Sequence, residues 1–74
     1  MKPDKVDFDV DSAGEWRWTR YDTGNHEIVG AATEGYKNRA ECIENATSQF
    51  GDSVDYTLRS EPFDPFHEGT AVVP

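Results

Sequence analysis

Three segments of the chain alternate between apolar and polar residues with a period of two, which is the pattern of half-buried β-strands. Residues 6–10 (VDFDV) and 54–58 (VDYTL) show it most plainly. Residues 15–22 add the aromatic and β-branched side chains that strands favour. Because a strand cannot bury its apolar face alone, the chain is expected to fold around a sheet.

A further strand is predicted over residues 26–32. It follows a hairpin turn in which Gly24 and Asn25 both tolerate a left-handed backbone. The apolar residues of this segment fall on both faces of the strand, which predicts burial from two sides. They are Ile28, Val29, Ala31 and Ala32.

One helix is predicted over residues 39–50. Asn38 followed by Glu41 is typical of a helix N-cap with its reciprocal partner, and Gly51 is typical of the residue that ends a helix. Between them, residues recur at helical spacing, namely Ala40, Ile43, Thr47 and Phe50. Cys42, the only cysteine, lies beside this face and is predicted to be a buried packing residue and not a nucleophile.

The predicted fold class is therefore α+β. It is a β-β-β-α-β unit, an antiparallel sheet with one helix packed on it, over residues 1–60. Residues 61–74 hold three of the four prolines and are predicted to be an extended or disordered tail. Phe63 and Phe66 in this tail either dock on a partner or fold back over the sheet, and we favour the fold-back because it covers apolar surface.

The acidic residues are spread along the whole chain. Fifteen Asp and Glu face only seven Lys and Arg among 74 residues, which gives a formal charge of −8. A chain this small buries about 60% of its unfolded surface, so its core is thin. The composition resembles that of proteins from extreme halophiles, with a halophilic archaeon as the expected source, because molar salt screens such self-repulsion.

Several short motifs occur together between residues 11 and 50. They are Trp16-Arg17-Trp18, the turn at Gly24-Asn25, Ile28-Val29, Glu34-Gly35-Tyr36 and Asn38-Arg39-Ala40. In this combination the chain resembles the YegP-like family of small uncharacterised proteins. Arg20 departs from the family pattern, which has an aliphatic residue there. This leaves open whether Arg20 is buried or pairs with a carboxylate at the end of the sheet.

The resemblance implies a unit that occurs in tandem or as a homodimer. In the dimer the two units share one continuous sheet and exchange their C-terminal strands. With one copy in this chain, the implied partner is a second copy, and Val54, Tyr56 and Leu58 are the implied dimer interface. The family brings no established activity, so a non-enzymatic homodimer of unknown biological role is expected.

A second hypothesis is a nucleic-acid or small-ligand binding module that uses Arg17, Arg20 and Tyr21. Aromatic side chains stack on bases, and Arg contacts phosphate. The alternative is that the nearby Trp16 and Trp18 simply form the core. The net charge of −8 opposes phosphate binding, so nucleic acid is an unfavoured partner.

No catalytic residue, metal site or cofactor is predicted. Asp64, His67, Glu68 and His26 are metal-ligand types, but no third strong ligand is fixed by their spacing. The first residues do not resemble a signal peptide, and no apolar run approaches the length of a membrane span. A cytoplasmic protein without a membrane partner is therefore expected.

Overall fold

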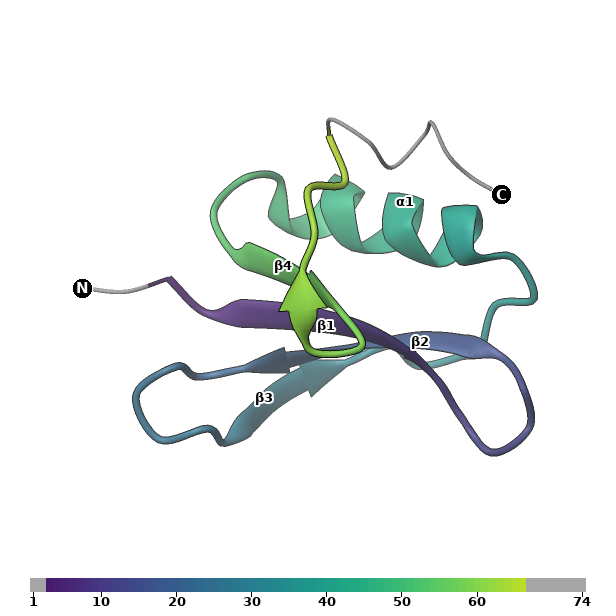
Figure 1. Cartoon of the computed structure of the whole chain (residues 1–74), viewed down its shortest axis with the longest axis horizontal. Coiled ribbons are helices and arrows are strands. Elements are labelled where there is room, and N and C mark those ends of the chain that lie inside the picture. Colours follow the sequence, from purple (N-terminus) through teal and green to yellow (C-terminus); the bar gives the residue numbers. More distant parts are fainter. Residues whose placement is uncertain (1–2, 67–74) are drawn as a thin grey trace.

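The computed structural model describes residues 3–66. It contains five strands and one helix in chain order: β1 (Lys5–Val10), β2 (Trp16–Tyr21), β3 (Ile28–Ala31), α1 (Arg39–Phe50), β4 (Asp55–Leu58) and β5 (Glu61–Pro62). The strands form one sheet in the order β3-β2-β1-β4-β5, and α1 covers one of its faces (Figure 1). The α+β class and the order of the first five elements are confirmed.

The sheet is mixed, so the prediction of an antiparallel sheet was wrong. β1 pairs antiparallel with β2, but it pairs parallel with β4. The cause is the helix between β3 and β4. This helix returns the chain to the end of the sheet at which β3 began, so β4 runs in the same direction as β3. β3 and β1 are both antiparallel to β2, and β4 is therefore parallel to β1.

The core lies between α1 and the helix-facing side of the sheet. Phe8 of β1 is fully buried and stacks on Tyr56 of β4, with ring centroids 5.8 Å apart. Trp18 of β2 meets the ring of Phe50 edge-on at 5.2 Å and donates its indole N–H to Asn45 Oδ1 at 2.8 Å. The buried apolar residues are Val6, Phe8, Trp18, Ala32, Cys42, Ile43, Ala46, Val54 and Tyr56.

The bounds of α1 agree with the prediction, but its cap differs. Gly51 has a φ of 59° and donates its N–H to Thr47 O at 2.9 Å, as a terminating glycine does. Asn38 is the N-cap residue, yet its side chain makes no capping hydrogen bond. Cys42 is buried in α1, and this burial raises the pKa of its thiol to about 11.

β3 is shorter than predicted, and its predicted burial from two sides was wrong. Ile28 is 64% exposed and Val29 is 54% exposed. The reason is position, because β3 is the edge strand of the sheet and α1 packs over its neighbour β2. In the turn before β3, the left-handed residue is His26, with a φ of 63°, and not Gly24 or Asn25.

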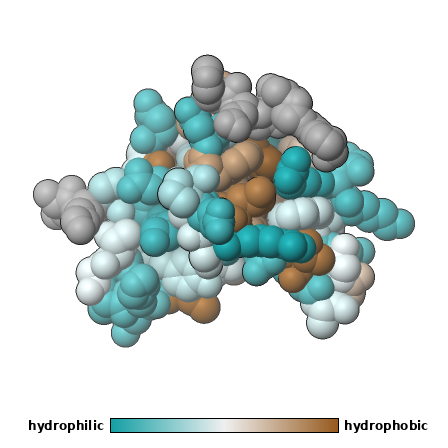
Figure 2. All heavy atoms as spheres, in the orientation of Figure 1, coloured by the Kyte–Doolittle hydropathy of each residue, from teal (hydrophilic) through white to brown (hydrophobic). Residues whose placement is uncertain are grey.

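The start of the predicted tail belongs to the sheet. Pro62 pairs with Thr57 in an edge strand, where its missing N–H breaks no ladder between inner strands. The ring of Phe63 meets Phe8 at 6.1 Å, and that of Phe66 meets Tyr56 at 5.9 Å, which confirms the fold-back. In the view of Figure 2, apolar residues gather near the centre of the molecule, beside β5, with hydrophilic residues around them.

No helix within residues 3–66 is long and apolar enough to cross a membrane.

Candidate functional site

The two faces of β2 have different environments. Trp18 and Trp16 lie opposite Phe8 and Val10 of β1, on the face that α1 covers. Trp18 is 5% exposed and belongs to the core, as the alternative hypothesis had it. Trp16 is half-buried, and its ring lies 5.9 Å from the guanidinium of Arg39 and 5.6 Å from that of Arg59. The two tryptophans therefore do not form an open stacking platform.

The structure does not bring Arg17, Arg20 and Tyr21 together on one face of β2. With a period of two, Arg20 shares the helix-covered face with Trp18. Its Nε donates to Asp4 Oδ2 at 2.8 Å, and its guanidinium lies 4.7 Å from the ring of Phe50. Arg20 thus pairs with a carboxylate at the end of the sheet.

Arg17 and Tyr21 lie on the open face of the sheet, opposite α1. Arg17 Nε donates to Asp11 Oδ2 at 2.7 Å, and Nη1 donates to Ala32 O at 3.3 Å. The backbone N–H of Glu15, followed by the Arg17 guanidinium, holds the pKa of Asp11 below its usual range. Arg17 is therefore engaged in holding the β1–β2 turn.

The implied interface residues Val54, Tyr56 and Leu58 pack within their own chain. Val54 and Tyr56 are buried, and Tyr56 also donates its hydroxyl to Gly51 O at 2.6 Å. Leu58 is half-buried and lies opposite Phe8 in the parallel pairing. An exchanged dimer would make the same contacts with the β1 of a second copy. These contacts are therefore compatible with both arrangements.

The outer edge of β3 is a surface that was missed from the sequence. Residues 28–33 (IVGAAT) carry no charge in a chain of net charge −8. Within residues 3–66, β3 pairs with β2 alone, which leaves its other edge without a strand. The sequence did show apolar residues on both faces of this strand. In the structure this pattern belongs to an exposed edge strand and not to a strand that is covered on both faces.

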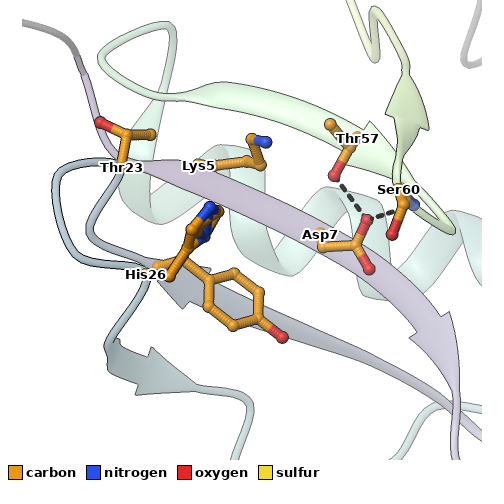
Figure 3. Close-up of a pocket in the computed structure, with 7 residues that line it drawn as sticks. Lys5, Asp7, Thr23, His26, Thr57 and Ser60 are labelled. Atoms are coloured by element: carbon orange, nitrogen blue, oxygen red, sulfur yellow. Dashed lines mark hydrogen bonds between the residues drawn. The ribbon is translucent and has the colours of Figure 1, made fainter.

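A pocket of about 180 Å³ lies on the open face (Figure 3). Lys5 and Asp7 of β1 and Tyr21 of β2 form its floor. The β2–β3 loop adds His26 on one side, and β4 with the following turn adds Thr57 and Ser60 on the other. Lys5 and Ser60 are 55 positions apart in the sequence, so no local sequence motif predicts the pocket.

The pocket orients the carboxylate of Asp7. Asp7 Oδ1 accepts hydrogen bonds from the hydroxyl of Thr57 and, at 2.8 Å, from the backbone N–H of Ser60. These two donors fix the carboxylate beside the β4–β5 turn.

No group of three or more metal-ligand side chains is close enough within residues 3–66 to hold a metal ion. Asp64 lies in the segment after β5, and His26 lies in the β2–β3 loop. His67 and Glu68, which were weighed with them, lie outside the described residues.

Comparison with known proteins gives one match. A family model described as a domain of unknown function (DUF1508) matches residues 11–48. No curated protein and no solved structure matches the chain. The matched region holds β2, β3 and most of α1, and YegP-like proteins are associated with this family. The chain therefore belongs to the DUF1508 family of small uncharacterised domains.

Proposed function

We propose that this chain is a non-enzymatic, self-associating domain that works as a homodimer in concentrated salt. The observation that carries the proposal is the outer edge of β3, where exposed Ile28 and Val29 accompany a strand edge without a partner in the described structure. Such an edge pairs readily with another strand. A second copy fits because an uncharged edge is where two chains of charge −8 repel each other least.

The non-enzymatic part of the proposal is supported by the chemistry of Cys42. Burial keeps its thiol protonated, which is the opposite of what a nucleophilic cysteine needs. A buried free thiol also suits a reducing compartment such as the cytoplasm. The dispersed carboxylates support the salt adaptation, because salt shields them from one another.

The nucleic-acid hypothesis has less support than self-association. Of its three residues, Arg20 lies on the helix-covered face and Arg17 is paired with Asp11. Only Tyr21 of the three both lies on the open face and lines a pocket.

Sedimentation equilibrium of Val29→Glu in molar KCl tests the role of the edge. A carboxylate on the edge of β3 should shift the protein to monomer, because two like charges would face each other across the contact. Ala40→Glu is the matched control. It adds the same charge at an exposed position of α1 and should leave the dimer intact. A wild-type protein that stays monomeric at high micromolar concentration contradicts the homodimer.

Exchange of the C-terminal strands, which the family resemblance implies, is the other route to a dimer. NMR on a mixture of labelled and unlabelled chains separates the two routes. In an exchanged dimer the contact between Phe8 and Tyr56 joins different chains, so filtered NOEs appear between them. In a dimer paired through β3 these NOEs stay within one chain.

A further inference from the structure

We propose that the pocket on the open face of the sheet binds a small oxyanion, a phosphate or short carboxylate group, with Lys5 as its charged partner. The site lies on the face opposite α1 and does not use the outer edge of β3. β4 contributes Thr57 to it, and an exchanged β4 would make the same contact with Asp7. The inference therefore stands or falls separately from the homodimer.

Several side chains that can donate hydrogen bonds line this pocket. Lys5 contributes an ammonium, Tyr21 and Ser60 contribute hydroxyls, and His26 contributes a ring N–H. Within residues 3–66 none of these four side chains has a hydrogen-bond partner. Asp7 is the one carboxylate in the lining, and its Oδ1 already accepts two hydrogen bonds. A ligand rich in acceptors, such as an oxyanion, complements this arrangement.

Lys5 stands apart from the paired cations of the chain. Arg17, Arg20 and Arg59 each form an ion pair with an aspartate. Lys5 forms none in the described part of the chain, although Asp55 lies opposite it in the parallel pairing with β4. Lys37 and Arg39 also form no ion pair within residues 3–66, but neither lines the pocket, so Lys5 is the cation that a ligand there can meet.

Backbone strain also gathers at this pocket. Within residues 3–66, three residues other than glycine have positive φ: His26 at 63°, Arg59 at 52° and Ser60 at 73°. His26 and Ser60 line the pocket from opposite sides, and Arg59 precedes Ser60 in the same turn. Such conformations are costly and are concentrated at binding sites, where neighbouring structure holds them.

The size of the pocket restricts the ligand. Its volume is about 180 Å³, below the roughly 300 Å³ of pockets for drug-sized molecules. Lys5, Thr57 and Ser60 also line a larger hollow of about 650 Å³ beside β5, into which the rest of a ligand can extend. The pocket therefore suits an inorganic oxyanion or the terminal group of a small metabolite. Tyr21 also lines the pocket, and its ring gives the non-ionic part of a ligand an apolar contact.

NMR titration with inorganic phosphate tests the site in the full-length protein. Ionic strength is held at about 1 M with KCl, so that general screening stays constant. We expect saturable shifts of the Lys5, Tyr21, His26 and Ser60 amide signals by about 50 mM phosphate, the range of a millimolar Kd. Acetate in place of phosphate then distinguishes a carboxylate ligand from a phosphate ligand.

Lys5→Met and Lys37→Met provide the matched comparison. Each removes one positive charge, and Lys37 is an exposed loop residue outside the pocket. Lys5→Met should weaken phosphate binding about tenfold, the value of one charge-assisted hydrogen bond, while Lys37→Met should change it less than about twofold. Shifts that do not saturate, or an equal loss in both variants, overturn the proposal. Unchanged thermal unfolding of both variants establishes that the fold is retained.

Discussion

Among the glycines within residues 3–66, the backbone of Gly35 lies nearest to a neighbouring side chain, that of Glu15. A Cβ at this position would lie 2.8 Å from the Cβ of Glu15, closer than real side chains come. The approach arises because Trp16 and Tyr36, the next residues along, exchange backbone hydrogen bonds of 2.7 and 2.9 Å. The Gly-Tyr motif therefore fixes the segment before α1 against β2.

Gly35→Ala should lower the free energy of unfolding by about 1–3 kcal/mol, because the added methyl forces this bridge apart. Urea denaturation at fixed salt measures the change. Gly30→Ala is the matched control, since its Cβ would meet Arg20 Cβ at an ordinary 3.7 Å. The control should differ from the wild type by less than about 0.5 kcal/mol. Equal effects at the two positions would contradict this role of Gly35.

Ser60 carries the largest positive φ of any non-glycine residue within residues 3–66, at 73°. Glycine adopts this conformation without steric cost and keeps the backbone N–H that donates to Asp7. Ser60→Gly should therefore raise the free energy of unfolding by about 1 kcal/mol.

Thermal and urea unfolding check the Ser60→Gly prediction against Ser12→Gly. Ser12 is an exposed turn residue without positive φ, so glycine there should be neutral or destabilising by about 0.5 kcal/mol. A destabilised Ser60→Gly protein would show that the left-handed backbone is not strained. No local turn motif predicted the conformation of Ser60, because its backbone N–H is held by Asp7, more than fifty residues away in sequence.

At the scale of elements, α1 was predictable and the direction of β4 was not. The helix bounds follow from local signals, the Asn38 position and the terminating Gly51. β4 was found by its alternation, but its parallel pairing with β1 depends on where the α1 crossover returns the chain. The pocket was unpredictable for the same reason, since Lys5, His26 and Ser60 meet only through this topology.

The segment after β5 contributes to the core through one of its two phenylalanines. Phe63 is half-buried against Phe8, whereas Phe66 is 58% exposed although its ring touches that of Tyr56. Phe63→Ala should cost about 2 kcal/mol of unfolding free energy and Phe66→Ala less than about 1 kcal/mol. Chemical denaturation measures the two losses, and the comparison is direct because both variants replace Phe by Ala. A larger loss for Phe66 would contradict the packing described.

At the scale of the whole molecule, repulsion outweighs attraction among surface charges. Three arginine–aspartate pairs within residues 3–66 stand against a total of fifteen acidic residues. Salt weakens both the attraction within the ion pairs and the repulsion between the acidic residues. Because exposed ion pairs contribute little to stability, the weaker repulsion should have the larger effect. We expect the free energy of unfolding to rise by at least about 1 kcal/mol between about 0.1 and 2 M KCl.

Calorimetry at several protein concentrations separates this screening from dimerisation, because only association depends on concentration. NaCl in place of KCl should give the same rise, because screening depends on ionic strength and not on which cation is present. A flat response to both salts would contradict adaptation to salt.

β1 is the central strand of the sheet, and this position affects the order in which the strands can pair during folding. One edge of β1 pairs with β2, which follows it after a short turn. Its other edge pairs with β4, and there Lys5 lies opposite Asp55, about fifty residues later in the chain. Closing so long a loop is entropically slower than forming a hairpin or a helix. While β4 is undocked, the open edge of β1 would accept the β4 of a second copy as readily as its own. If the proposed homodimer forms by strand exchange, the rate at which β4 docks within its own chain, relative to the rate at which two chains meet, would therefore set how often exchange occurs.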